Sequence, residues 1–363
     1  MRRSRKIDYV ILVVILLLVS YGLLILSSAS SDIGQTRFDN PYHYLWRQII
    51  YGLGLGLIGF LAGLYVPYAK YKKLAPLFLF LSLIVVILPF TPLGFSSGGA
   101  SRWINLGPFS FQPAEILKIF FIIYIAAWLS SYHKNRQAGF MEGLIPFLAI
   151  SGFVSLILLL QRSTSAMVLL MVGVLAVYFA SGAKKLYILS IIVGGFVFVA
   201  ATIYFTPYRL DRITSFLTPH ADVEGSSYQI NQARITIGSG GLWGVGYGNS
   251  LSKEYLPERI GDSIFAIVAE EFGFVGATAL MLLFLILITR GFILSKKIRD
   301  PFGKLLLVGF STIIGFQAFV HIGSISGLIP LTGVPLPYIS YGGTALAVFM
   351  TIAGIMLNIS KNA

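Results

Sequence analysis

The sequence predicts an all-α integral membrane protein that crosses a lipid bilayer about ten times. Its composition is 56% hydrophobic and only 11% charged, with a mean hydropathy of +0.83. Soluble domains carry roughly 25% charged residues, so this chain has about half the usual share. Its apolar residues gather in runs near the ~20 residues that a membrane-spanning helix needs. We therefore expect a single polytopic membrane domain over residues 1–363.

The apolar runs are separated by short polar segments, and each is a candidate spanning helix. They lie at 8–27, 48–66, 74–90, 114–131, 143–160, 166–181, 186–206, 263–289, 305–325 and 344–359. The first run continues into a polar segment without an obvious small-residue cleavage site. It is therefore expected to be a retained span rather than a signal peptide.

The positions of Lys and Arg predict the orientation, because short cytoplasmic loops are enriched in basic residues. If the N-terminus is cytoplasmic, 17 of the 27 basic residues fall on that side, mostly in short loops. Both termini are then cytoplasmic. Three long segments rich in Gly, Pro and Ser face outward: 91–113, 207–262 and 326–343. The second is a large extracellular loop between the seventh and eighth spans, and we expect all three to meet over one cavity, since irregular backbone near a membrane needs such shelter.

Several function classes are disfavoured by the sequence. The net charge of +13 lies in clusters between apolar runs, which indicates topology rather than nucleic-acid binding. The chain has no cysteine, and its four histidines lack ligand spacing. The glycine-dense stretch from Gly238 to Gly248 fits neither common nucleotide-binding fingerprint. Ser340 has no His or Asp nearby in sequence that would make it a nucleophile.

Asp262 is the first candidate for chemistry, because it stands where the long outer loop enters the eighth apolar run. A carboxylate there is placed to accept a proton from a hydroxyl, as a general base does. The alternative is a helix N-cap, in which the carboxylate accepts backbone N–H bonds. A firmly bonded cap would be a weaker base.

Two further acidic sites lie inside apolar runs, where an ionisable group is costly and is a functional candidate. Glu270 and Glu271 point about 100° apart on a helix, so they need not face the same cavity. Glu115 and Lys118 are spaced i, i+3 and can pair on one helix face. In both cases a structural role competes with a functional one, and for both we favour the structural role.

The outer loop contains several cations, which suit an anionic lipid headgroup such as a pyrophosphate. The alternative is solvated loop charge, partly paired with loop carboxylates. These cations are Arg209, Arg212, Arg234, Lys253 and Arg259.

Three long motifs together resemble the SEDS family of bacterial envelope proteins, the group of FtsW, RodA and SpoVE. The first runs from Gly99 to Ile104 and from Phe111 to Lys118, and the second from Pro207 through Asp262 to Gly273. The third runs from Gly327 to Gly343 and includes Pro330, Gly333, Pro337 and Ser340. The resemblance extends over most of the chain.

This resemblance implies a ten-span peptidoglycan glycosyltransferase that polymerises lipid II at the outer membrane face, for cell division or cell-shape maintenance. It implies Asp262 as the catalytic carboxylate and as a possible ligand of a divalent cation, Mg²⁺ or Mn²⁺. It implies a class B penicillin-binding transpeptidase as partner, and supporting roles for Glu115, Lys118, Glu270 and Glu271. The expected substrate-binding residues are Arg102, Arg209, Arg212, Arg234, Lys253, Gln229 and Ser340.

Some positions depart from the family's pattern. Gly261 and Ser263 flank Asp262 where Thr and Phe are usual, Arg162 reverses the charge of an outer carboxylate, and His321 replaces a common Asn. The change beside Asp262 favours the division type slightly over the elongation type. Two other functions remain open: a lipid II flippase, and a non-catalytic scaffold for the transpeptidase.

Overall fold

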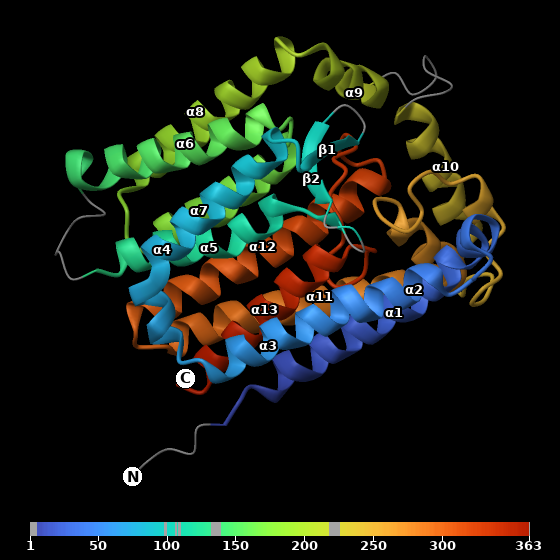
Figure 1. Ribbon diagram of the computed structural model, residues 1–363, viewed down its shortest axis with the longest axis horizontal. Coiled ribbons are helices and arrows are strands. Elements are labelled where there is room, and N and C mark those ends of the chain that lie inside the picture. The colour runs from blue at the N-terminus through green and yellow to red at the C-terminus, as the bar shows by residue number, and fades with distance from the viewer. Residues whose placement is uncertain are drawn as a thin grey trace.

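A computed structural model describes residues 6–97, 100–105, 107, 110–131, 139–217 and 226–362. In the described residues the chain is a bundle of long helices with their ends gathered at two opposite poles (Figure 1). Both termini lie at the same pole. Gly99, at the start of the first motif, lies outside the described ranges. So do five of the basic residues counted for the orientation: Arg2, Arg3, Arg5, Lys134 and Arg136.

The first half of the bundle contains long helices joined by tight turns and one small sheet. Its elements are α1 (Tyr9–Phe38), α2 (His43–Arg47), the π-helix η1 (Gln48–Gly54), α3 (Leu55–Tyr65), α4 (Tyr68–Ile87), the 3₁₀ turn η2 (Leu88–Phe90), β1 (Gly94–Ser97), β2 (Ala100–Asn105), β3 (Ser110–Phe111) and α5 (Pro113–Leu129).

The second half contains helices and irregular loops but no strand in the described residues. Its elements are the π-helix η4 (Phe140–Leu144), α6 (Ile145–Leu160), α7 (Thr164–Ala180), α8 (Lys185–Tyr204), α9 (Pro207–Leu217), α10 (Ser226–Ser239), the 3₁₀ turn η5 (Ser252–Glu254), α11 (Ile264–Lys297), α12 (Pro301–Ile325) and α13 (Gly343–Ser360).

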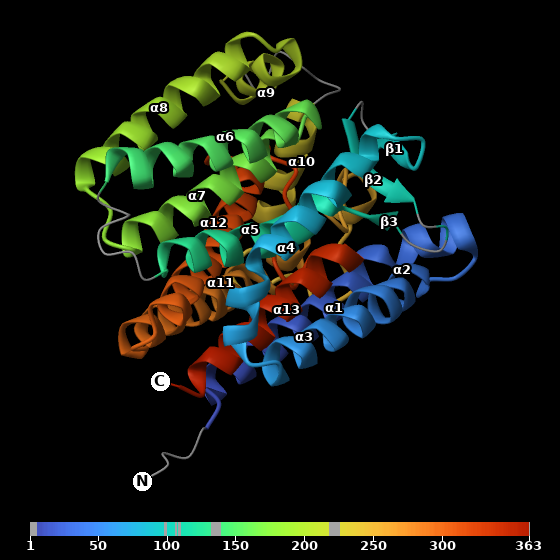
Figure 2. The same ribbon diagram turned by 60° about the vertical axis from the view of Figure 1, so that its left-hand side comes forward.

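Burial separates the central helices from the peripheral ones. Helices α12 and α13 are buried along most of their length, whereas α8 has no buried residue and lies at the edge of the bundle (Figures 1 and 2). A helix that is apolar on all sides and yet exposed in an isolated chain is typical of a lipid-facing helix. Eight helical stretches of the described chain are long and apolar enough to cross a membrane. The protein is therefore a multi-pass membrane protein.

All ten predicted apolar runs are helical over most of their length, and two of them differ in kind from the expectation. The first helix does not end near residue 27 but continues to Phe38, where Asp39 adopts a left-handed conformation and ends it. Its polar second part is held by side chains of α11 and of the outer loop, because Ser28 bonds to Glu271 and Asp32 pairs with Lys253. Hydropathy does not reveal these contacts. The second run begins with the π-helix η1, a form often found at functional sites.

The segments expected to be irregular contain regular structure. A small antiparallel sheet in the order β1-β2-β3 occupies the segment 91–113, so the fold is mostly rather than entirely helical. Strand pairing satisfies backbone groups that the apolar surroundings would otherwise leave unpaired. Likewise the segment 207–262 is not one open loop, because it contains α9 and α10.

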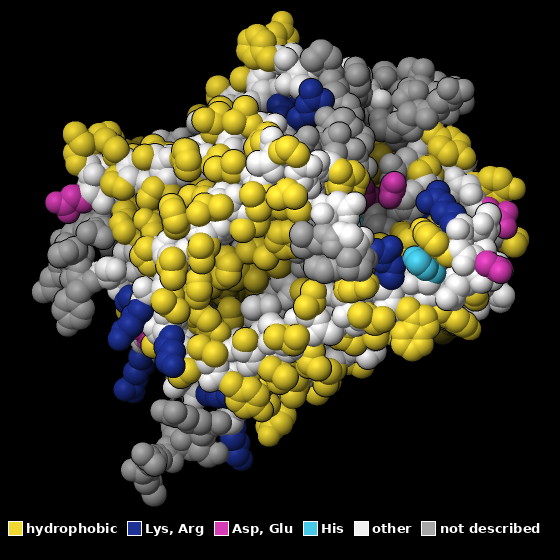
Figure 3. Space-filling view, in the orientation of Figure 1, with side chains coloured by type: hydrophobic (Ala, Val, Ile, Leu, Met, Phe, Trp, Pro, Cys, Tyr) yellow, Lys and Arg dark blue, Asp and Glu magenta, His cyan; other side chains and the backbone are white. Residues whose placement is uncertain are grey.

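The pole that holds both termini is closed by an ion pair. Arg290 on α11 donates to Asp8 at the start of α1, with Nε to Oδ2 at 2.9 Å and Nη2 to Oδ2 at 2.7 Å. The Asp8 backbone N–H donates to Ser360 at the end of α13. Lys and Arg gather at this pole, and a broad apolar region separates it from the opposite pole (Figure 3).

Candidate active site at the pole opposite the termini

Asp262 lies in a turn directly before α11. The backbone N–H groups of Gly261 and Ser263 both donate to the carbonyl of Glu258, which closes the turn. Ser263, not Asp262, occupies the N-cap position, and its side chain donates to the Pro257 carbonyl instead of the helix. The capping alternative for Asp262 is therefore wrong, because the aspartate stands one residue too early. Its carboxylate is partly exposed and accepts no hydrogen bond from the described residues.

The turn is held in place by the segment before α13. Ser340 is buried, and its hydroxyl donates to the Gly261 carbonyl at 2.8 Å while accepting from the Leu336 N–H at 2.8 Å. The Tyr341 N–H donates to the Ile260 carbonyl at 2.8 Å. Ser340 thus supports the peptide next to Asp262. Because its hydroxyl already donates one hydrogen bond and accepts another within the protein, it does not fit the expected contact with substrate.

Gln48 extends this support into the π-helix. Its side chain is buried, accepts from the Gly342 N–H at 3.1 Å and donates to the Ser340 carbonyl at 3.4 Å. A hydrogen-bonded path therefore runs from η1 through the 340–342 segment to the residue before Asp262. On the other side, Gln229 on α10 donates to the Ser263 hydroxyl at 3.0 Å. Gln229 reaches the residue next to Asp262 rather than the carboxylate itself.

The surroundings of Asp262 make it a better base than a free aspartate. The pKa of Asp262 is raised to about 6, mainly by burial and in addition by the nearby carboxylate of Glu258. Arg212 and Arg102 act in the opposite direction, because a nearby cation favours the ionised form. A general base is most effective when its pKa lies near the working pH, and a value near 6 approaches that range.

The approach to Asp262 is kept open by a glycine. Gly333 has φ of +64°, and a Cβ at this position would lie 3.3 Å from the Asp262 Oδ2. Any other residue would be strained in this conformation and would crowd the carboxylate. The glycine of the third sequence motif therefore leaves room beside Asp262.

Only two of the expected substrate-binding cations act on Asp262. Arg102, on β2, donates through Nε to the Gln161 carbonyl at 3.4 Å and through Nη2 to the Arg162 carbonyl. Arg212, on α9, donates to the Leu331 carbonyl at 3.1 Å. Both guanidinium groups are anchored by backbone oxygens while their charge acts on Asp262.

The other expected cations lie elsewhere on this pole. Arg209 donates to Thr202 and Thr206, and Arg234 donates to the Gly327 carbonyl at 3.0 Å. Lys253 and Arg259 both approach Asp32, at 3.4 Å and 3.9 Å. The large loop thus holds its cations in separate groups rather than in one clamp.

Glu115 and Lys118 form the predicted ion pair, with Nζ to Oε2 at 2.8 Å. Both side chains are buried inside the bundle. Lys118 also donates to Gln317 at 2.9 Å, and Gln317 donates to the Pro335 carbonyl at 2.8 Å. The pair therefore links α5 and α12 to the segment that supports Asp262, a structural arrangement in agreement with the favoured interpretation.

Glu270 is enclosed by serines from the outer loop. It accepts from the hydroxyls of Ser239, Ser250 and Ser252 and from the Ser252 N–H, with distances of 2.8 Å to Ser252 Oγ and 3.3 Å to its nitrogen. Such a saturated carboxylate fixes the loop against α11. It has little capacity left for substrate.

Glu271 contacts a different group of residues, which the 100° spacing of the two glutamates allows. It accepts from the hydroxyl of Ser28 on α1 and joins the first helix to α11. Glu270 and Glu271 are therefore both placed in structural contacts, on different sides of one helix.

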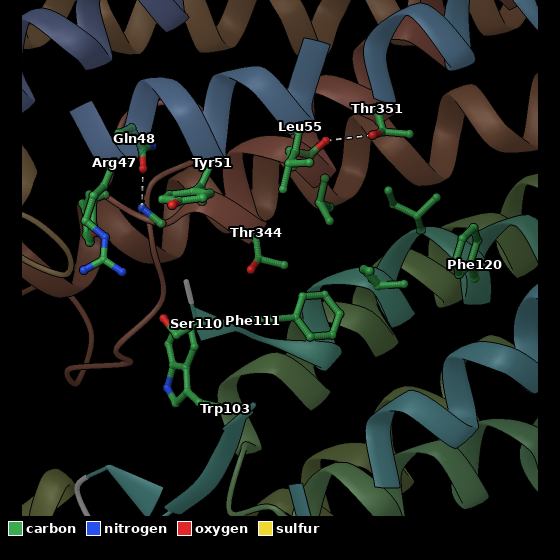
Figure 4. Close-up of a pocket in the computed structure, with 17 residues that line it drawn as sticks. Arg47, Gln48, Tyr51, Leu55, Trp103, Ser110, Phe111, Phe120, Thr344 and Thr351 are labelled. Carbon is green, nitrogen blue, oxygen red and sulfur yellow. Dashed lines mark hydrogen bonds between the residues drawn. The ribbon is translucent and has the colours of Figure 1, made fainter. Parts of the chain in front are cut away.

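An apolar cavity of about 340 Å³ adjoins the Asp262 turn. Arg47 and Trp103 stand at one end, and Phe120 and Thr351 at the other, with Tyr51 and Thr344 between them (Figure 4). Asp262 does not line this cavity. The two are connected through Tyr341, which lines the cavity and bonds to Ile260.

Two departures from the family's pattern have visible structural consequences. Arg162 adopts a left-handed φ of +56°, and its carbonyl accepts from Arg102. His321 is buried in α12, with Nδ1 2.7 Å from the Val334 carbonyl. Each of them therefore supports a segment near Asp262.

Three residues near the site escaped the sequence prediction. Gln48 lies inside an apolar run and carries no charge, although its polarity there was a usable signal. Asp32 was assigned to a loop because the first apolar run ends before it. Glu258 is one of the loop carboxylates that the sequence offers to the loop cations, and its closeness to Asp262 follows from the turn rather than from any sequence pattern.

Comparisons with known proteins agree with this fold and these motifs. A family model described as "Cell cycle protein", covering FtsW, RodA and SpoVE, matches residues 8–363. A probable peptidoglycan glycosyltransferase FtsW from Geobacter sp. (strain M18) is 35% identical, with 99% of this chain and 98% of that protein covered. Stage V sporulation protein E of Bacillus subtilis (strain 168) is 34% identical, with 98% and 97% covered.

Solved structures resemble the whole chain. A chain from a peptidoglycan synthase complex, studied for the structural coordination of polymerization and crosslinking, superposes with a TM-score of 0.81 at 26% identity, with 98% of both chains covered. The rod shape determining protein RodA of Thermus thermophilus gives a TM-score of 0.70 at 26% identity, with 98% and 97% covered. Sequence and structure together place this chain in the FtsW, RodA and SpoVE family of cell cycle proteins.

Proposed function

We propose that this chain is a peptidoglycan glycosyltransferase that polymerises lipid II at the outer face of the bacterial cytoplasmic membrane. The observation that supports this most directly is Asp262: a partly exposed carboxylate with a raised pKa, next to two arginines. Relatives named peptidoglycan glycosyltransferase support the reaction class. The positive pole then faces the cytoplasm, and Asp262 faces outward.

In the proposed reaction, the 4-hydroxyl of the acceptor sugar attacks the anomeric carbon of the growing chain. The bond to undecaprenyl pyrophosphate breaks, and a single displacement inverts the donor's α-linkage to β-1,4. Asp262 takes the hydroxyl proton, a contribution of typically ~10² to 10⁴ in rate. Arg102 and Arg212 lie close enough to act on Asp262 and are the candidates for holding the pyrophosphate.

The apolar cavity suits part of a polyprenyl chain. Its walls are mostly hydrophobic side chains of η1, α5 and α13, and Arg47 stands at one end. A lipid tail held there would keep the pyrophosphate near the membrane surface and the sugar near Asp262. This alignment reduces the entropy cost of bringing two lipid-linked sugars together.

The site offers few carboxylates for a divalent cation. The described residues contain no group of three or more His, Asp or Glu that could hold a metal ion. Mg²⁺, however, is commonly bound by one or two carboxylates together with substrate phosphates. Asp262 and Glu258 are the residues that would hold it, since Asp262 accepts no hydrogen bond from the described residues. When bound, the cation would stabilise negative charge on the pyrophosphate.

A class B penicillin-binding transpeptidase is the proposed partner. A structural relative comes from a complex that coordinates polymerization with crosslinking. Crosslinking is the transpeptidase reaction, so the two activities would work on one glycan strand.

The test is polymerisation of purified lipid II by the reconstituted chain, with and without the transpeptidase. Asp262→Ala is compared with wild type, and Glu254→Gln is the matched control, because Glu254 is an exposed carboxylate of the same loop. We expect glycan from wild type and Glu254→Gln and none from a folded Asp262→Ala. Lipid translocation without glycan would instead support a flippase, and full activity of Asp262→Ala would support a scaffold.

A further inference from the structure

A group of exposed apolar side chains lies in the glycine-dense segment between α10 and η5. Leu242 is 66% exposed, Trp243 79% and Tyr247 50%. Beside them on α11, Phe274 is 63% and Val275 46% exposed. We call these five residues the loop wedge. Contiguous exposed apolar surface on a folded protein marks a contact with a membrane or another protein.

The loop wedge is attached to a break in α11. Gly273 has φ of +64° and ψ of −165°, which interrupts the helix, and a Cβ there would collide with the backbone of Gly244 and Leu242. The Phe274 N–H donates to the Gly241 carbonyl at 2.9 Å and the Val275 N–H to the Leu242 carbonyl at 3.2 Å.

Two more bonds run in the opposite direction across the break. Val245 and Gly246 donate their N–H groups to the carbonyls of Glu270 and Glu271, at 2.9 Å and 3.1 Å. The N–H and carbonyl groups that the break in α11 leaves unpaired within the helix therefore bond to backbone groups of the loop. The loop cannot move along α11 without breaking these bonds, so its depth along the helix is fixed.

That depth can be measured from the ion pair of Asp8 and Arg290 at the positive pole. Along α1, Ser28 lies twenty residues from Asp8, or about 30 Å at 1.5 Å per residue. Along α11, Phe274 lies sixteen residues from Arg290, or about 24 Å. The hydrocarbon layer of a bilayer is about 30 Å thick. Ser28 therefore lies at the far edge of this layer, and Phe274 of the loop wedge lies about 6 Å inside that edge.

The side chains around this level have the distribution expected of a membrane boundary. Below it, α11 exposes apolar side chains such as Leu282 and Leu285. At it, Ser28 bonds to Glu271, and Ser27 shares a hydrogen bond of 2.5 Å with Tyr247. Above it, Asp32 lies four residues, or about 6 Å, beyond Ser28 and pairs with Lys253. Trp and Tyr are enriched at such boundaries in membrane proteins.

We propose that the loop wedge is inserted into the lipid at the boundary between the headgroups and the acyl chains. Its partner is the bilayer itself, since its apolar surface is continuous with the lipid-facing side of α11. The insertion fixes the outer loop at a constant depth and holds Lys253 and Arg259 at the level of the lipid phosphates. This inference depends on the position of the helices in the membrane and not on the reaction at Asp262.

The absence of cysteine from the chain allows a direct test. A nitroxide spin label is placed at Leu242→Cys in the full-length chain, reconstituted in vesicles of phosphatidylcholine and phosphatidylglycerol. Glu254→Cys, in the same loop but polar and exposed, is the matched control, and Leu282→Cys on α11 is the lipid reference. Collision rates are measured with oxygen, which concentrates in lipid, and with a water-soluble nickel chelate.

We expect the label at position 242 to resemble that at 282, with frequent oxygen collisions and few nickel collisions, while 254 shows the reverse. Equal nickel access at 242 and 254 would show a solvated loop and overturn the proposal. Low access to both reagents at 242 would mean that protein covers the surface, and would also overturn it.

A second measurement guards against an effect of the label. With Trp46, Trp103 and Trp128 changed to Phe, Trp243 is the one remaining tryptophan. Its fluorescence should be blue-shifted and quenched by lipids brominated near the headgroup more than by lipids brominated near the chain end. Strong quenching by acrylamide together with weak quenching by every brominated lipid would contradict the insertion.

Discussion

Asp262 and Glu270 lie eight residues apart and illustrate two opposite uses of a carboxylate. Glu270 is buried and accepts four hydrogen bonds from three serines. Asp262 is partly exposed, accepts no hydrogen bond from the described residues, and faces Glu258 as well as two arginines. A saturated carboxylate stabilises the fold, whereas an unsaturated one with a raised pKa can accept a proton. Acidic residues in apolar surroundings are therefore not equivalent candidates for catalysis.

Replacement of Asp262 should have the largest effect on activity. Asp262→Asn keeps the size of the side chain but cannot take a proton, so polymerisation should fall by ~10²-fold or more. Because few contacts are lost, the melting temperature in detergent should stay close to that of wild type. The measurement is the initial rate of glycan formation from lipid II. A rate near wild type would remove Asp262 from the mechanism.

Replacement of Glu270 should show the reverse pattern. Glu270→Ala leaves the hydroxyls of Ser250 and Ser252 without their acceptor, whereas Ser239 still donates to the Thr236 carbonyl. A buried unpaired group such as the Ser250 hydroxyl costs about 1–3 kcal/mol. We expect a clear loss of thermal stability, measured by the unfolding temperature of the purified protein. Glu270→Gln is the matched control, because it keeps one acceptor oxygen and should lose less. An active, fully stable Glu270→Ala variant would contradict the structural role.

The sequence predicted the scaffold better than the site. Apolar runs locate spanning helices because nearly all residues of a lipid-facing helix are apolar, as in α8. The sequence also indicates Asp262 as a candidate, since a carboxylate at the mouth of an apolar run is conspicuous, and its catalytic role stays a prediction. Ser340 and Gln48 were misassigned or missed, because their contacts join segments almost 300 residues apart, as between Gln48 and Gly342. Such contacts depend on tertiary packing and leave no local pattern.

Tertiary packing also decides which cations of the outer segments act on Asp262, and the sequence does not show this. Arg102, Arg212 and Lys253 were equivalent in sequence as basic residues near a polar loop. The fold separates them, since Arg102 and Arg212 act on Asp262 while Lys253 pairs with Asp32 on the extended first helix. The pairing of Lys253 depends on where α1 ends, and hydropathy placed that end about eleven residues too early.

Ser340 is a supporting residue of the Asp262 turn, so its replacement should affect both stability and turnover. Ser340→Ala removes the hydroxyl that bonds to Gly261 and Leu336, which should cost about 1–3 kcal/mol of stability. Because the Asp262 turn loses its support, the turnover rate should fall several-fold while the KM for lipid II changes little. Ser340→Thr is the matched control, since it keeps the hydroxyl. A raised KM with an unchanged turnover rate would indicate substrate contact instead.

The smallest expected effect concerns the pKa of Asp262. A base must be ionised, so the rate should rise with pH and level off above about 6, the pKa of Asp262. Glu258→Gln removes a negative charge that raises this pKa, which should move the acidic limb to lower pH. Arg212→Gln removes a cation that lowers the pKa, and its limb should move to higher pH. Opposite shifts from the two variants, in a pH profile of glycan synthesis at saturating lipid II, would assign the limb to Asp262. If neither variant shifts the acidic limb of the pH profile, the limb reports the titration of a group other than Asp262.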